Sequence, residues 1–110
     1  RRIAEDADAG RRAGLERIAE AVEAAGRGEQ PAASWMAGVA GRYEGDRRVE
    51  VIDGALWYRR GERMAERLIW LGGARFALGH EQRVTFEGTG AAARLLMEQR
   101  DEAVAYARER

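Results

Sequence analysis

The stretch that decides the fold is residues 49–58, Val-Glu-Val-Ile-Asp-Gly-Ala-Leu-Trp-Tyr. From residue 48 to residue 53 the side chains alternate, with Arg48, Glu50 and Ile52 between Val49, Val51 and Asp53. This is the period-two pattern of a strand. Asp53 and Gly54 follow, and this pair tolerates the positive φ angles of a tight two-residue turn. Residues 55–58 are again apolar, so the whole stretch predicts a β-hairpin.

Further strands are predicted beyond the hairpin at residues 67–71, 75–78 and 83–87, with glycine-rich turns between them. Short strands about 8–12 residues apart are typical of an antiparallel sandwich or a small barrel. The core should come mainly from the apolar residues of these strands: Val49, Val51, Leu56, Tyr58, Leu68, Trp70, Phe76, Leu78, Val84 and Phe86.

Residues 91–109 fit two different structures. Their residue types favour a helix, and their apolar positions even form a helical stripe. The alternative is a hairpin of residues 94–98 and 103–108, which would turn at residues 99–102. Pattern alone does not decide between them.

Residues 1–28 are predicted to form a helix, rich in Ala, Arg and Glu. Its apolar face carries Leu15, Ile18 and Val22 at helical spacing. Glycines at positions 10 and 14 weaken the helix, so we expect a break near residue 10 or a frayed start. Glycine at position 26 or 28 can end the helix in a left-handed cap.

This helix needs a partner, because a helix of this length is marginal alone in water. We expect the apolar face to fold back on the rest of the chain or, preferably, to pair with a second copy. A linker at residues 28–34 divides the chain into two parts. These are an N-terminal helical segment, residues 1–28, and an antiparallel β module, residues 35–110. The expected fold class is α+β, mostly β, with about seven or eight short strands.

The charges balance, because 19 arginines and no lysine stand against 19 aspartates and glutamates. This argues against nucleic-acid binding through bulk positive charge, while a local arginine patch stays open. No apolar run is long enough to span a membrane and no signal peptide is visible, so no membrane partner is expected. Cysteine is absent, which excludes disulfides and thiolate metal sites. Because the chain begins with Arg1 rather than Met, we expect a piece of a longer protein.

Residues for catalysis are scarce. Ser34 is the only serine and His80 the only histidine, and the serine lies in the linker rather than in a nucleophile elbow. A catalytic triad needs rigid mutual support that these two positions do not offer. Carboxylate pairs at residues 6 and 8 and at residues 101–102 are expected to be ordinary solvated charges. We therefore expect no enzyme activity, no metal and no cofactor.

One short motif has the glycine spacing of dinucleotide-binding sites. Gly88, Gly90 and Ala93 follow a predicted strand in the pattern G-x-G-x-x-A. A dinucleotide site needs a parallel βαβ unit and an acidic residue about 20 residues further on. Too little chain follows for that, so the motif predicts a turn.

Two sets of side chains are candidates for binding. The aromatic residues could line a ligand cavity, but in alternating strands they are more often core: Tyr43, Trp57, Tyr58, Trp70, Phe76, Phe86 and Tyr106. Arg59, Arg60, Arg63 and Arg67 bracket one hairpin and could bind an anion or a partner carboxylate. Glutamates at positions 62 and 66 are interleaved with them, which favours local charge compensation.

The segment from residue 37 to residue 78 resembles a known kind of module. The features are Gly-Arg-Tyr at residues 41–43, the hairpin at residues 49–58, and Leu-Ile-Trp-Leu-Gly-Gly-Ala-Arg-Phe-Ala-Leu at residues 68–78. They are similar to the small β domain appended C-terminally to bacterial serine peptidases of the tail-specific, C-terminal-processing type. A similar module follows some serine β-lactamase-like hydrolases.

The resemblance implies a fold and a role. In such proteins an Ala-rich helix ends the catalytic domain, a linker follows, and a Gly-Arg-Tyr strand opens the module. The module ends in a strand, a polar turn and a strand, which favours the hairpin for residues 91–109. The nucleophile and base would lie in an upstream domain that this chain lacks, so no catalytic residue carries over.

The expected function is therefore a non-catalytic accessory or interaction domain that packs on, or binds for, a larger hydrolase. Its expected partner is the catalytic domain of that hydrolase or a second copy through the N-terminal helix. Two alternatives remain open. One is a lipocalin-like small-ligand binding barrel with a cavity between Trp57, Trp70 and Phe86. The other is a homodimerising module that pairs through Leu15, Ile18 and Val22.

Overall fold

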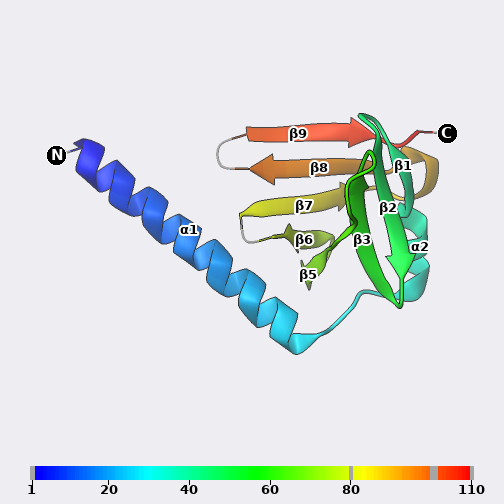
Figure 1. Cartoon of the computed structure of the whole chain (residues 1–110), viewed down its shortest axis with the longest axis horizontal. Helices are drawn as coiled ribbons and strands as arrows, with labels where there is room; N and C mark the ends of the chain where they lie inside the picture. Colours follow the sequence, from blue (N-terminus) through cyan, green and yellow to red (C-terminus); the bar gives the residue numbers. More distant parts are fainter. Residues whose placement is uncertain (1, 80, 100–101, 110) are drawn as a thin grey trace.

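The computed structural model describes residues 2–79, 81–99 and 102–109, and the side chains of helix α1 from Arg11 onward. Its elements form two antiparallel sheets and two α-helices (Figure 1). Sheet A contains β1 (Gly41–Tyr43), β2 (Arg47–Ile52), β3 (Ala55–Arg60) and β4 (Glu66–Arg67). Sheet B contains β5 (Ile69–Gly72), β6 (Arg75–Leu78), β7 (Gln82–Glu87), β8 (Arg94–Gln99) and β9 (Glu102–Ala107). The helices are α1 (Arg2–Arg27) and α2 (Ala33–Val39), and η1 (Gly90–Ala92) is a 3₁₀ turn.

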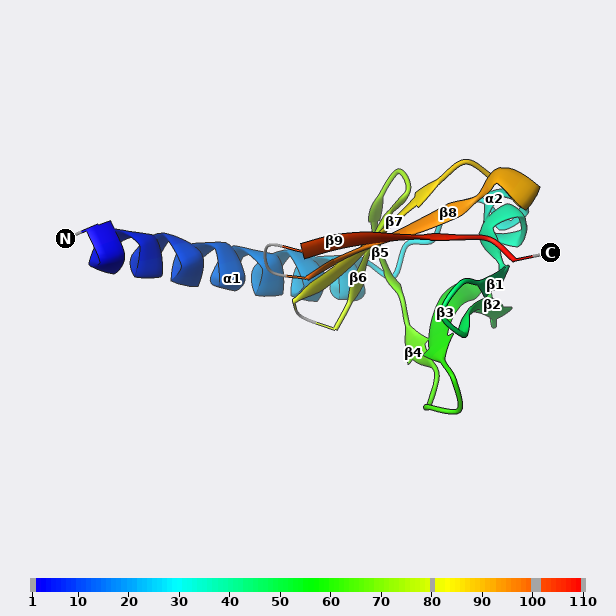
Figure 2. The ribbon, with the colours of Figure 1, turned by 90° about the horizontal axis from the view of Figure 1, so that it is seen from above.

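The expectation of a mostly β, antiparallel fold is confirmed, but the sheets do not close into a barrel. Each sheet is a simple meander in which consecutive strands are neighbours. Seen from above, sheet A stands across one end of sheet B, so the two sheets meet at a corner (Figure 2). No helix among the described residues is long and apolar enough to cross a bilayer.

The central hairpin forms as predicted. β2 and β3 pair in continuous register from Arg47 opposite Arg60 to Ile52 opposite Ala55. Asp53 and Gly54 have φ angles of 50° and 75°, which are the two left-handed positions that a tight hairpin turn requires.

The strand expected at residues 67–71 is instead divided between the two sheets. β4 pairs with β3 in sheet A, whereas β5 begins sheet B by pairing with β6. Leu68 is the corner between them; its side chain is fully buried and its N–H donates to the Leu56 carbonyl at 2.9 Å. A continuous apolar run looks the same whether it stays in one sheet or turns a corner, so the pattern could not reveal the division.

The C-terminal residues form the hairpin and not the helix. β8 and β9 pair along their whole length, from Arg94 opposite Ala107 to Gln99 opposite Glu102. Leu95 is fully buried and Met97 packs against the core, which is the alternation that a strand requires. The helical propensity of these residues is overridden by pairing with β7 and by burial.

The core lies in the corner between the sheets, and eight of the ten expected core residues are buried there. Two expectations were wrong: Val51 is 43% exposed because it lies near the end of the β2–β3 hairpin, and Trp70 is only partly buried. Phe76 is fully buried, and its ring lies 5.7 Å from that of Phe86. The ring of Trp35 stacks on Phe76 at 5.9 Å.

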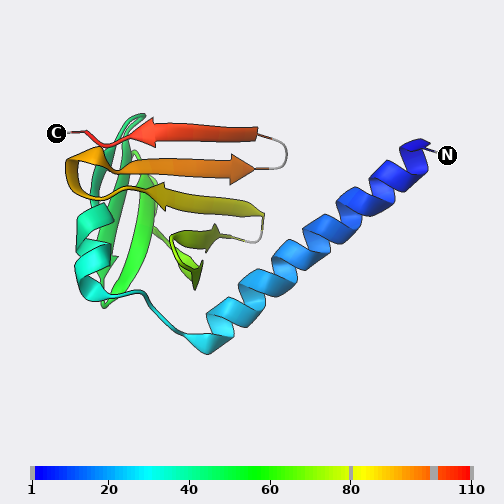
Figure 3. The ribbon, with the colours of Figure 1, turned by 180° about the vertical axis from the view of Figure 1, so that it is seen from behind.

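Trp35 belongs to α2, a helix that the sequence did not predict. The expected linker at residues 28–34 reaches into the first turn of α2. Met36 and Val39 are buried, so this short helix covers the open end of the core beside sheet A (Figure 3). Seven residues are too few to show a helical stripe, and the stabilisation comes from packing.

A buried hydrogen bond joins α2 to sheet A. The Tyr43 hydroxyl donates to the Val39 carbonyl at 2.6 Å. Burial raises the pKa of Tyr43 above its ordinary value of 10.0, although the charge of Arg108 lowers it. Burial likewise raises the pKa of Tyr58, against the opposing effect of Arg47. Both hydroxyls therefore stay neutral at neutral pH, and Tyr43 keeps its donor proton.

Helix α1 is continuous, so the expected break near residue 10 is absent. Gly28 has a φ of 65° and ends the helix in the expected left-handed cap. The last turns fold back on sheet B and contact β5, while the N-terminal turns extend away from the body (Figure 1). Ala21 and Ala24 are the residues that become buried, and the predicted face of Leu15, Ile18 and Val22 remains exposed.

Candidate functional site

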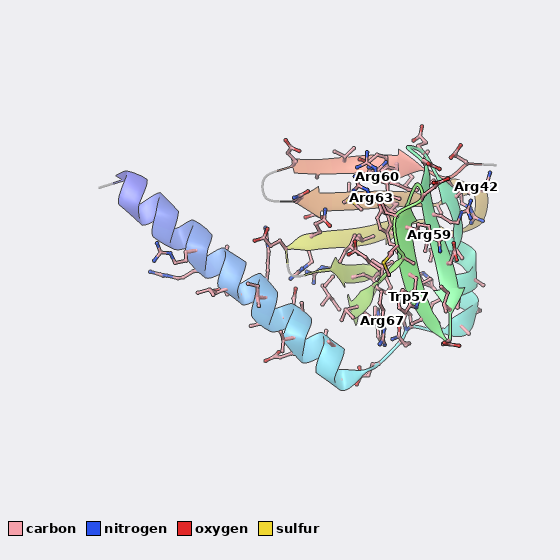
Figure 4. All side chains as sticks on the ribbon, viewed as in Figure 1. Arg42, Trp57, Arg59, Arg60, Arg63 and Arg67 are labelled. Carbon is pink, nitrogen blue, oxygen red and sulfur yellow. The ribbon has the colours of Figure 1, made fainter. Side chains whose placement is uncertain are left out.

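The outer face of sheet A carries a row of three arginines. Arg42 on β1 lies directly opposite Arg48 on β2, and Arg48 lies directly opposite Arg59 on β3. Val49 and Tyr58, one position along, face the core, so the arginines occupy the opposite face of the pleated sheet. We call these three residues the arginine row; Arg42 and Arg59 are labelled in Figure 4.

Among the described residues the arginine row forms a single ion pair, and Asp46 and Glu109 line a pocket beside Arg42 and Arg48. Arg48 forms an exposed ion pair with Glu50 at 4.0 Å, a contact worth at most about 1 kcal/mol. Arg42 and Arg59 form no ion pair within 4.0 Å among the described residues, and the Arg59 Nε is buried without a hydrogen-bond partner there. Like charges directly opposite one another destabilise a sheet. Repulsion within the arginine row therefore lowers the stability of the free protein, and an anionic partner would relieve this repulsion.

A second row lies beside the first on the same face. Glu50, Trp57 and Arg67 are cross-strand neighbours on β2, β3 and β4, and the Trp57 side chain is half-buried. Arg60 lies at the end of β3 and Arg63 in the loop to β4, and both are labelled in Figure 4.

The expected local compensation by glutamates 62 and 66 is found only in part, since Glu66 lines a pocket with Arg60 and Arg63 without pairing to them. No ion pair joins either carboxylate to Arg59, Arg60, Arg63 or Arg67. Along a strand and a tight loop, neighbours in sequence point in different directions, so interleaving in the sequence does not produce contact. Arg59 and Arg67 lie on the outer face of sheet A, whereas Arg60 and Arg63 line a pocket together with Glu66.

An apolar groove adjoins the second row. It has a volume of about 380 Å³ and lies between the last turns of α1 and the strands β3, β4 and β5. Val22 and Ala25 line the helix side, and Trp57, Arg67 and Ile69 line the strand side. Trp57 and Arg67 thus belong both to the arginine-bearing face and to the groove.

Arg47 differs from the arginines of the row, because its side chain is buried and has a structural role. It is buried, and its guanidinium lies 3.6 Å from the centre of the Tyr106 ring and donates to the Tyr106 hydroxyl at 2.9 Å. It also donates to the Gly45 carbonyl at 3.1 Å. These contacts tie the β1–β2 turn to β9, so Tyr106 acts at the joint between the sheets and not in a cavity.

The other aromatic residues are separated by the fold. Tyr43, Tyr58, Phe76 and Phe86 are buried in the core, whereas Trp57 faces outward. Trp70 is partly buried, and its indole Nε1 donates to the Gly73 carbonyl. Trp57, Trp70 and Phe86 therefore do not surround one cavity, as the lipocalin-like alternative required.

Among the described residues, those considered for catalysis and nucleotide binding do not form a site. Gly88 and Gly90 have positive φ angles in the connection between the antiparallel strands β7 and β8, so they form a turn without a parallel βαβ unit. Ser34 is exposed in the first turn of α2, and His80 lies outside the described residues. Asp101 and the side chains of residues 6 and 8 also lie outside them. Among the residues described, no group of three His, Cys, Asp or Glu could hold a metal ion.

Sequence reasoning missed Arg42 and Arg48 as members of the site. The signal was present in the hairpin, since a two-residue turn at positions 53 and 54 sets Arg48 opposite Arg59 by counting. The pairing of β1 with β2, which adds Arg42, depends on the turn at residues 44–46, whose Gly45 and Asp46 at positive φ were a signal that the sequence reasoning did not use.

Comparison of the chain with protein families, with curated proteins and with solved structures yields no match.

Proposed function

We propose that this chain is a non-catalytic interaction domain that docks a larger protein, such as the hydrolase that the sequence resemblance suggests. The observation that supports this most is the arginine row beside Trp57 on the outer face of sheet A, where Arg42 and Arg59 form no ion pair among the described residues. Arginine and tryptophan are the residues most enriched at the energetic centres of protein interfaces. The interior, in contrast, is packed with apolar side chains and serves stability.

The isolated chain should not hydrolyse peptides or β-lactams. Purified protein incubated with a fluorogenic peptide mixture and with a chromogenic cephalosporin should give rates equal to buffer, because Ser34 is exposed on a short helix and no described residue is hydrogen-bonded to it as a base. The matched control is Ser34→Ala, which should behave identically. Turnover by the wild type that disappears in Ser34→Ala would overturn the proposed function.

Self-association is a second candidate function, favoured by the exposure of Leu15, Ile18 and Val22 on α1, at 60%, 36% and 56%. Three side chains bury little area, so we expect a weak dimer. Sedimentation velocity at several concentrations should show the mean mass rising with concentration, and Leu15→Glu should abolish the rise. A mass that stays monomeric at every concentration would contradict this candidate.

A further inference from the structure

We propose that the arginine row and the adjoining groove together bind an amphipathic acidic helix of a protein partner. Carboxylates along one edge of that helix meet the arginine row, and a large apolar side chain enters the groove beside Trp57. This inference rests on the proposed function and specifies the chemistry of the partner.

The spacing of the row matches a helix laid across the strands. Neighbouring strands lie about 4.8 Å apart, so Arg42, Arg48 and Arg59 span roughly 10 Å. Two turns of an α-helix advance about 11 Å. Glutamates at positions i, i+4 and i+7 of a partner helix therefore face the three arginines in order. The mismatch of about 1 Å is small for flexible arginine side chains.

The groove lies beyond the arginine row, in the direction in which the partner helix crosses the strands. β4 is the next strand beyond β3, and Ala65, just before β4, lines the groove together with Trp57 and Arg67. A partner side chain one turn further on, at position i+11, reaches this place. Val22, Ala25 and Ile69 give it an apolar surface. Docking would bury the exposed part of Trp57, as at a typical interface centre.

The mixed character of this face favours a protein over a nucleic acid. Glu50 stands beside the arginine row, the groove is apolar, and the net charge of the chain is zero. A phosphate backbone carries no apolar group and would leave the groove empty. A helix with both carboxylates and apolar side chains matches the arginine row and the apolar part of the groove.

The test uses the full chain and a defined probe. The probe is a synthetic alanine-based helical peptide with Glu at i, i+4 and i+7 and Leu at i+11, and binding is measured by titration calorimetry. The triple variant Arg42→Gln/Arg48→Gln/Arg59→Gln should weaken binding about 10- to 100-fold, since each exposed pair is worth up to about 1 kcal/mol. The control Arg11→Gln/Arg12→Gln/Arg94→Gln removes the same charge from exposed positions outside sheet A and should change affinity less than about twofold.

A second arm leaves the protein unaltered, so it stays informative if the triple variant folds poorly. The peptide with Gln at the three Glu positions should lose the same 10- to 100-fold, and the peptide with Ala at i+11 should bind about tenfold more weakly.

Three results would overturn the inference: absence of measurable binding, equal losses in the two triple variants, or tighter binding of a thymidine oligonucleotide that competes with the peptide. None of these results would show catalytic activity, so the inference can fail while the proposed function stands. Conversely, the hydrolysis assay can overturn the proposed function without any binding measurement.

Discussion

Phe76→Ala should lower the free energy of unfolding by about 3–5 kcal/mol, the range observed for truncating a fully buried phenylalanine. The Phe76 ring stacks on Trp35 and meets Phe86 edge-on, so its removal leaves a cavity bordered by two large rings that cannot close it. Urea unfolding followed by tryptophan fluorescence measures the change. Such a loss is a large fraction of the stability of a small domain.

Val104→Ala is the matched control for this substitution. Val104 also lies in sheet B, but it is 45% exposed on β9, so its truncation should cost less than about 1 kcal/mol. Equal effects of the two substitutions would contradict the placement of the core.

Arg83→Ala should detach helix α1 and lower the free energy of unfolding by about 2–3 kcal/mol. The Arg83 side chain is 9% exposed; its Nη2 donates to the Arg17 carbonyl at 2.7 Å and its Nε donates to Glu20 at 3.3 Å. Hydrogen bonds to a charged group are among the stronger ones, and Arg83 forms two of them between sheet B and α1. A detached α1 is marginal alone in water, so far-UV circular dichroism should also show a loss of helix.

Arg75→Ala tests whether burial is the cause. Arg75 pairs with the same Glu20 at 3.7 Å, but its side chain is 55% exposed, so the substitution should cost less than about 1 kcal/mol and preserve the helix signal. If both arginine variants keep the full helix signal, the docking of α1 through Arg83 is contradicted.

The strands could be predicted from the sequence wherever turn chemistry and alternation agreed. The Asp53–Gly54 turn determined the β2–β3 register, and that register already placed Arg48 opposite Arg59. The corner at Leu68 could not be predicted, because an apolar run does not show which sheet it joins.

Long-range packing accounts for the remaining differences. Trp35 packs against the core because α2 places it there, and α2 is too short to show a helical periodicity in the sequence. Helix α1 docked through Ala21 and Ala24, since small side chains allow close approach and buried Arg83 adds specific bonds. The larger apolar residues of α1 stayed outside, which a stripe on a helical wheel does not reveal.

The central claim, that the outer face of sheet A is the docking surface, is tested most directly by nuclear magnetic resonance of the arginine Nε–Hε groups. Addition of the acidic helical peptide should shift the signals of Arg42, Arg48 and Arg59 and leave those of Arg11, Arg75 and Arg94 in place. Shifts spread evenly over all six arginines, or confined to the last three, would contradict the claim.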